Sequence, residues 1–191
     1  MEYNFNQRKK DVLEKSDKSS KQSWDKKIIE LCNLINSSEN YYTTSSCAGR
    51  VVLMKDEEKK GEGLFLKVWH DEINFEIFKN ELNKIIEHDF TPKGKFKLES
   101  PIIHIVCKNL ESALELLEFA KYLGFRRSGI SSFSRNIILE LNSTEKIEFP
   151  IIEKNKVLVD DEFFKIVLGK SNFFLERGWR KIEKLKNFFE N

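Results

Sequence analysis

The stretch that decides the fold is KFKLESPIIHIVCKNLESALELLEFAKYLGFRRSGI, residues 95–130. Its first part predicts two short strands, one on each side of Pro101. The segment ESALELLEFAKYLG predicts a helix that ends at Gly124, because glycine commonly follows the last helical turn. After Gly124 the pattern becomes that of a strand again, so this stretch predicts two strands, a helix and a further strand in sequence.

Further strands and helices are predicted on both sides of this stretch. Strand patterns precede it within residues 41–70 and follow it in SGISSF, NIILELN, KIEFPII and VLVD. The helical patterns cover residues 5–16, 24–37 and 71–89, and a long one runs from Asp161 to the C-terminus with an interruption expected at Gly169.

The order of these elements predicts an α+β protein with two β-rich groups, each carrying a helix, and with helical N- and C-termini. We expect residues 1–191 to form a single compact domain. Strands and helices do not alternate regularly, and neither a GxGxxG sequence after a strand nor a Walker A sequence occurs. The pattern therefore excludes a Rossmann methyltransferase fold and a P-loop nucleotide site.

The composition is that of a soluble globular protein. Hydrophobic residues make up 40% and charged residues 34%, and 33 basic residues against 31 acidic ones give a net charge of +2, which excludes a disordered chain and a strongly basic nucleic-acid binder. No apolar stretch approaches the roughly 20 residues that span a bilayer. The start MEYNFNQRKK lacks an apolar signal region, so we expect a cytoplasmic protein without a membrane partner.

The three cysteines, Cys32, Cys47 and Cys107, are widely spaced and form no CxxC pair. This spacing favours buried thiols and gives no indication of a metal site.

The segment TTSSCAGR, residues 43–50, is the first candidate site. In a regular strand Thr44 and Ser46 would share one face, and Thr43 and Ser45 the other. The hydroxyls and the planar guanidinium of Arg50 suit a phosphate or a carboxylate. A hydroxyl-rich strand that leads into a tight turn, without a site, explains the segment equally well.

Three further segments carry candidate chemistry. FRRSGIS, residues 125–131, leaves a helix and offers Arg126, Arg127 and backbone N–H groups near Ser128 and Gly129 to an anion, or forms a simple exposed turn. In PIIHIVC, His104 is either a proton acceptor or a core histidine satisfied by one hydrogen bond.

The polar segment SDKSSK, residues 16–21, is either a solvated linker or a flap over a site.

Several segments together resemble the tRNA wybutosine-synthesizing protein 3 family over nearly the whole chain. They occur in the family's order and are SDKS at 16–19, YYTTSSCAGR at 41–50, KVWH at 67–70, FKLESPIIH at 96–104 and AKYLGFRRSGI at 120–130. TTSSCAGR and GFRRSGI are the most specific of them.

The resemblance implies an S-adenosylmethionine-dependent methyltransferase with an unusual α+β fold. The implied acceptor is a ring nitrogen, N4, of the tricyclic demethylwyosine-type base next to the anticodon of phenylalanine tRNA. The partners expected from it are the anticodon loop of this tRNA and S-adenosylmethionine, with no obligate protein partner.

On this resemblance we assign candidate roles to the matching residues. The candidate catalytic residues are His104 as the base, Ser46 and Arg50. The candidate donor-binding residues are Ser45, Ser46, Arg50, Ser128 and Gly129. The candidate RNA contacts are Lys18, Lys21, Arg126, Arg127, Tyr42, Trp69 and His70.

Two other functions compete with this one. A non-catalytic tRNA-binding factor would present the modified anticodon loop to another enzyme without binding S-adenosylmethionine. A small hydrolase would use Ser46 or Cys47 as its nucleophile and would need no methyl donor.

Overall fold

The structure is a computed structural model that describes residues 2–14, 25–57, 63–88, 92–134 and 136–190. Its helices are α1 (Glu2–Leu13), α2 (Ile29–Ser37), α3 (Phe75–His88), α4 (Leu110–Tyr122) and α5 (Asp161–Glu190). Its strands are β1 (Tyr41–Cys47), β2 (Arg50–Lys55), β3 (Phe65–Trp69), β4 (Lys93–Glu99), β5 (Ile102–Cys107), β6 (Gly129–Ser132), β7 (Ile137–Asn142), β8 (Ile147–Glu153) and β9 (Lys156–Val157).

The chain divides into two compact units, each built on one antiparallel sheet. Unit 1 comprises Met1–Ala48, Pro101–Thr144 and Gly178–Asn191, and its strands have the order β1-β5-β7-β6. Unit 2 comprises Gly49–Ser100 and Glu145–Arg177, with the order β3-β2-β4-β8-β9. The predicted α+β class with two β-rich groups is confirmed, and both sheets are antiparallel throughout, unlike a Rossmann sheet. That residues 1–191 act as a single domain stays a prediction.

At three places, consecutive strands of the chain belong to different units. The chain leaves one sheet and enters the other between β1 and β2, between β4 and β5, and between β7 and β8. The two strands predicted on either side of Pro101 are thus both present, but they never pair with each other. Each sheet therefore combines strands from both halves of the sequence, which the order of the elements alone does not indicate.

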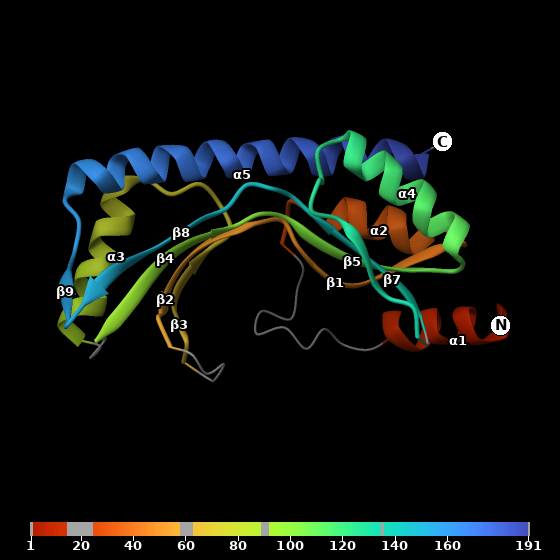
Figure 1. Ribbon diagram of the computed structural model, residues 1–191, viewed down its shortest axis with the longest axis horizontal. Coiled ribbons are helices and arrows are strands. Elements are labelled where there is room, and N and C mark those ends of the chain that lie inside the picture. Colours follow the sequence, from red (N-terminus) through yellow and green to blue (C-terminus); the bar gives the residue numbers. More distant parts are fainter. Residues whose placement is uncertain (1, 15–24, 58–62, 89–91, 135, 191) are drawn as a thin grey trace. The chain divides into compact units, whose positions relative to one another are not determined.

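The core of unit 1 lies between its sheet and the helices α2, α4 and the last part of α5 (Figure 1). The sheet contributes the alternate residues of β5 and β7, Ile103, Ile105, Leu139 and Leu141, which are all fully buried. The opposite face of the sheet is covered by α1, where Phe5 packs on Tyr42 and Val106. Further along the strands, the same face carries residues that are half-buried or exposed.

The core of unit 2 is aromatic. The ring of Phe78 on α3 lies within 6 Å of the rings of Trp69, Phe96 and Phe164, at 5.8, 5.9 and 4.9 Å between centroids. Phe164 stands in the first part of α5. Helix α5 therefore continues past Gly169, where the sequence predicted an interruption. The burial of Phe164 in this core outweighs the cost of about 1 kcal/mol for a glycine inside a helix.

Most predicted elements are present, and their bounds differ by a few residues. Helix α2 begins at Ile29 instead of residue 24, since Ile28 has a non-helical ψ of −8 with φ −120. Trp24, Ser23 and the whole SDKSSK segment lie outside the described residues. Among the helices that the structure describes, none has the length and the apolar character needed to cross a membrane.

Candidate active site

The hydroxyl-rich strand β1 contains a β-bulge between Thr43 and Ser45. Thr43 faces α2, where its N–H and its hydroxyl both donate to Asn36 Oδ1. Beyond the bulge the alternation shifts by one residue, because a bulge sets two residues opposite one on the partner strand. The prediction that Thr43 and Ser45 share a face is therefore wrong, since Ser45 pairs with His104 on the face opposite the helices.

Ser45, His104 and Glu140 form a row across three neighbouring strands, β1, β5 and β7. Ser45 Oγ lies 2.7 Å from His104 Nδ1, and His104 Nε2 lies 3.2 Å from Glu140 Oε2. The side chains of His104 and Glu140 are 29% and 33% exposed. The interpretation of His104 as a core residue is thus wrong: its ring is reachable from solvent and has two polar partners.

Glu140 was not among the residues singled out from the sequence. It stands in NIILELN as one polar residue of an ordinary alternating strand, so nothing local distinguishes it. The pairing of β5 with β7 sets it directly opposite His104. A hydroxyl, an imidazole and a carboxylate in contact form a chain along which a proton can move.

The turn at Ser128 and Gly129 borders the same row. Gly129 lies opposite Glu140, and a methyl group added at Gly129 would meet no atom within 4 Å. The backbone N–H of Ser128 is already used, because it donates to the carbonyl of Phe125 at 3.3 Å. The Ser128 hydroxyl is used too, since it accepts from the Asn142 N–H at 2.9 Å. Ser128 therefore shapes the turn, and the open space lies at Gly129.

Ser46 points to the helix side of the sheet, opposite to Ser45. It pairs with Ile103, a core residue, and its hydroxyl interacts with the thiol of Cys32 on α2. Burial raises the pKa of Cys32 to about 11, and the nearby hydroxyl of Ser46 reduces that rise. The Ser46 hydroxyl itself is buried and has no hydrogen-bond partner within the described part of the chain. Ser46 is thus part of the packing between β1 and α2, on the face away from His104.

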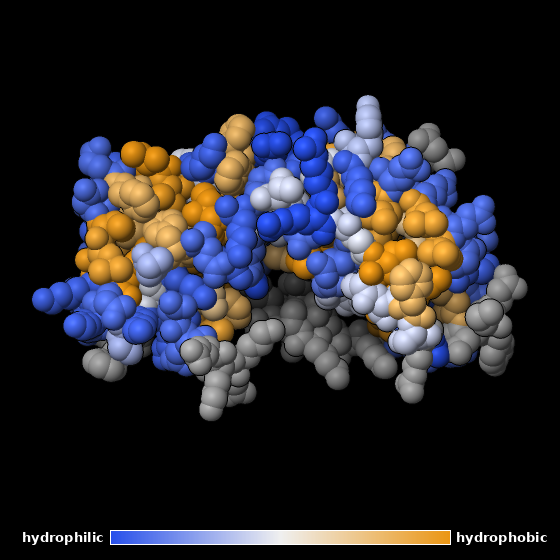
Figure 2. Space-filling model, in the orientation of Figure 1, coloured by the Kyte–Doolittle hydropathy of each residue, from blue (hydrophilic) through white to orange (hydrophobic). Residues whose placement is uncertain are grey.

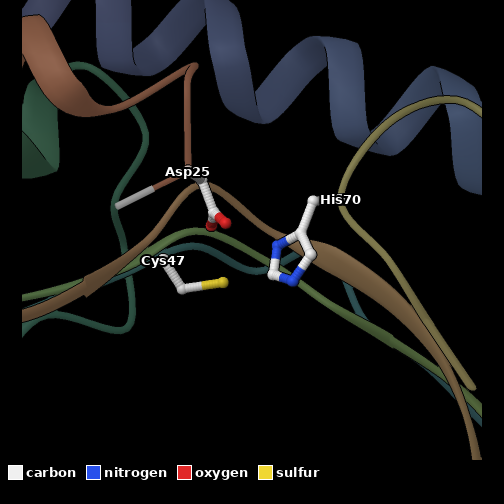
Figure 3. A group of neighbouring side chains, drawn as sticks. All are labelled: Asp25, Cys47 and His70. Atoms are coloured by element: carbon white, nitrogen blue, oxygen red, sulfur yellow. The ribbon is translucent and has the colours of Figure 1, made fainter. Parts of the chain in front are cut away.

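Asp25 and Cys47, both drawn in Figure 3, lie close together in unit 1. A carboxylate oxygen of Asp25 and the sulfur of Cys47 are within 4.8 Å of each other, and Asp25 Oδ2 accepts from the Ala48 N–H at 3.0 Å. The third side chain in Figure 3, His70, belongs to unit 2. Asp25 therefore holds the end of β1 in place. Asp25 was not singled out from the sequence, because it stands at the start of the predicted helix over 24–37, where an acidic residue is common.

The other candidate residues are distributed over both units. Tyr42 is 1% exposed and packs on Phe5, so its ring belongs to the core of unit 1 and offers no surface for stacking on a base. Arg126 and Arg127 are both exposed. In unit 2, Arg50 pairs with Glu99, and Trp69 packs on Phe78. Lys18 and Lys21 lie outside the described residues.

The outer surface of α4 is unsuited to a phosphate backbone. It exposes three glutamates, Glu111, Glu115 and Glu118, together with apolar side chains. Figure 2 shows this apolar surface over α4, where Leu114 and Tyr122 are 50% and 86% exposed. Because nucleic-acid affinity depends on cations that neutralise phosphates, α4, which exposes a single cation, Lys121, beside these glutamates, is a poor tRNA surface.

Comparisons with known proteins identify the family to which the chain belongs. The family model described as methyltransferase TYW3 matches residues 7–191. The chain is 36% identical over 190 residues to a protein of Thermococcus sibiricus named tRNA(Phe) 7-((3-amino-3-carboxypropyl)-4-demethylwyosine(37)-N(4))-methyltransferase, covering 97% of this chain and 94% of that one. It is 39% identical to the protein of the same name from Methanocaldococcus jannaschii, covering 81% and 80%.

Solved structures give the same result for the fold. The PH1069 protein from Pyrococcus horikoshii superposes with a TM-score of 0.86 at 30% identity, covering 98% of this chain and 97% of that one. A hypothetical protein from Aeropyrum pernix shares the fold, with a TM-score of 0.74 at 22% identity over 87% and 97% of the two chains. The family model and these relatives thus define a methyltransferase, and its antiparallel sheets differ from a Rossmann sheet. The chain belongs to the TYW3 methyltransferase family.

Proposed function

We propose that this protein transfers a methyl group to N4 of the 7-aminocarboxypropyl-demethylwyosine base at position 37 of phenylalanine tRNA, next to the anticodon. This is the activity in the names of its relatives. We further propose that the donor is S-adenosylmethionine and that the reaction takes place in the cytoplasm.

The observation that carries the proposal is the exposed row of Ser45, His104 and Glu140. Methylation of a ring N–H forms an N–C bond and releases a proton, so the enzyme needs a group that takes this proton. His104 suits that role, because imidazole is the side chain most often used as a general base near neutral pH.

When bound, S-adenosylmethionine supplies an electrophilic methyl group on a sulfonium. The protein then has to hold donor and acceptor in line, which is worth roughly 7–11 kcal/mol of the barrier. We propose that the donor lies near Gly129, because the space above this residue is open. The hydroxyl of Ser45 is the other donor contact that we propose on this face of unit 1; the buried hydroxyl of Ser46 lies on the other face, and that of Ser128 is used in its turn. Arg50, in unit 2, is proposed separately as a contact of the donor's carboxylate.

Recognition of the tRNA rests on exposed cations. Arg126 and Arg127 are exposed at the turn that precedes β6, on the unit that carries His104. We propose that both contact phosphates of the anticodon loop, and that Lys18, Lys21, Trp69 and His70 also contact the RNA. Guanidinium groups suit phosphates because their N–H groups bind two oxygens at once.

The test uses phenylalanine tRNA from cells that lack this gene. The protein is incubated with this tRNA and S-adenosylmethionine, the RNA is digested, and the tricyclic nucleoside is analysed by mass spectrometry. We expect a nucleoside one methyl group heavier, only with protein and donor together. His104→Ala should reduce the rate by about 10²–10⁴-fold, the range for loss of a general base, whereas His88→Ala in unit 2 is the control.

A different result would favour the competing function. If the protein binds this tRNA but transfers no methyl group and shows no affinity for S-adenosylmethionine, it is a binding factor that delivers the tRNA to another enzyme.

A further inference from the structure

Both ring nitrogens of His104 already have partners. Nδ1 lies 2.7 Å from Ser45 Oγ, and Nε2 lies 3.2 Å from Glu140 Oε2. A substrate N–H that approached either nitrogen would have to displace one of these side chains. The hydroxyl of Ser45, in contrast, belongs to an exposed residue at the outer end of the row.

The partners of His104 determine where its proton resides. An ionised carboxylate can only accept hydrogen bonds, so the contact with Glu140 requires a hydrogen on Nε2. In the neutral imidazole the other nitrogen, Nδ1, is then an acceptor. Ser45 Oγ–H therefore donates to Nδ1, which leaves the lone pairs of this exposed hydroxyl to accept a further proton.

We propose that Glu140 is a positioning residue that holds His104 in the Nε2–H form, and that the hydroxyl of Ser45 is the group that takes the proton from the substrate. The proposal rests on the methyl transfer proposed above and names the residues through which its proton leaves.

The step balances as a concerted relay. The N4 lone pair of the base forms a bond to the methyl carbon, and the C–S bond breaks with its electron pair remaining on sulfur. The proton of N4 passes to Ser45 Oγ while the proton of Ser45 passes to His104 Nδ1. The resulting imidazolium lies beside the carboxylate of Glu140 and later gives its proton to water.

The pairing of the strands places Glu140 beside His104. Its backbone lies directly opposite His104 in the β5–β7 pairing. Its second oxygen, Oε1, accepts from Asn142 Nδ2 at 3.5 Å, which orients the carboxylate. The neighbour on the other side is Gly129, which has no side chain that could compete for the carboxylate.

The first test measures the form of the imidazole directly. In protein labelled with ¹⁵N-histidine, nitrogen chemical shifts distinguish the two neutral forms, and His104→Ala identifies the signals of His104 among those of the three histidines. We expect the Nε2–H form in the wild type and a mixture of both forms in Glu140→Gln. The control is Glu148→Gln, in the other sheet, whose side chain is 30% exposed and likewise paired.

The second test separates the two proton acceptors. If Ser45 takes the proton, Ser45→Ala should lower kcat about as much as His104→Ala, by at least about 10²-fold. Thr44→Ala removes a neighbouring exposed hydroxyl of the same strand, and it should leave kcat within about twofold. Glu140→Gln should lower kcat by about 10–100-fold with little change in KM, and should move the acidic limb of the pH–rate profile to lower pH.

The outcomes are distinct. The relay is overturned if Glu140→Gln keeps both the Nε2–H form and the wild-type kcat, or if Ser45→Ala transfers methyl groups as fast as Thr44→Ala. Glu140→Asp, which keeps the charge, should retain more activity than Glu140→Gln and shows whether the loss comes from charge or from folding. If the wild type itself transfers no methyl group, the proposed function fails first, and the relay fails with it.

Discussion

Arg50 and Glu99 lie directly opposite each other on β2 and β4, and Arg50 Nε donates to Glu99 Oε2 at 2.6 Å. The guanidinium also lies over the ring of Phe65, 5.1 Å from its centre. Burial alone would raise the pKa of Glu99, but hydrogen bonds from Lys97 and Arg50 hold it below the usual value. Arg50 is therefore held in one orientation by unit 2 itself.

This pairing makes the role of Arg50 testable. If Arg50 binds the carboxylate of the methyl donor, Arg50→Ala should weaken donor binding by roughly 10–100-fold, the effect of about 1.5–3 kcal/mol for a hydrogen bond to a charged group. Glu99→Gln removes the partner and keeps the guanidinium, so it should change the affinity less than threefold. Isothermal titration calorimetry with S-adenosylmethionine measures both, and an unchanged Kd for Arg50→Ala would exclude Arg50 from donor binding.

Gly129→Ala tests whether a ligand approaches the backbone beside Glu140. The added methyl group meets no protein atom within 4 Å, and Gly129 does not have a left-handed φ. We therefore expect the free energy of unfolding to stay within about 0.5 kcal/mol of the wild type. Donor affinity should fall at least tenfold if the donor occupies this space. Equal affinity for the variant and the wild type would place the donor elsewhere.

Two glycines of α5 should respond in opposite ways to alanine. A methyl group at Gly178 would lie 2.7 Å from Cγ and 2.8 Å from Cδ of Pro101, so Gly178→Ala should lower the free energy of unfolding by about 1–3 kcal/mol. At Gly169 the methyl group meets nothing within 4 Å, and Gly169→Ala should raise the same quantity by about 0.5–1 kcal/mol. Urea denaturation of both variants measures the difference, and equal effects would contradict the packing of Gly178 on Pro101.

The stability of the protein should fall at alkaline pH. Burial raises the pKa of Cys32 to about 11 and that of Cys107 to about 12, from an ordinary value of 9.0. Above pH 9 the thiols of the unfolded chain ionise while those of the folded protein stay protonated. The stabilisation is therefore complete below pH 9 and is lost as the pH rises toward 11 and 12, with a slope of at most about 1.4 kcal/mol per pH unit for each thiol.

Urea denaturation between pH 8 and pH 10.5 checks this dependence. Cys32→Ala and Cys107→Ala should each reduce the slope, whatever their effect at pH 8. Cys47→Ala, at a half-buried position, is the matched control. A slope that is the same in all three variants would show that other groups cause the alkaline loss.

The sequence by itself determined the elements of the fold and their class. Within the described part of the chain, periodicity and turn residues located the helices and most strands to within a few residues, because hydrophobic spacing and glycine positions are local properties. The sequence also singled out two of the three residues of the row. Ser45 and His104 stand in segments of unusual composition, and the resemblance to the family depends on those segments.

The tertiary structure decided which residues meet. The bulge after Thr43 moved Ser45 to the face of His104, and the pairing of β5 with β7 placed Glu140 beside the imidazole. It also set Ser46 and Tyr42 into the core and paired Arg50 with Glu99. Register and bulges depend on how distant strands bury their apolar residues together, so no single segment encodes them.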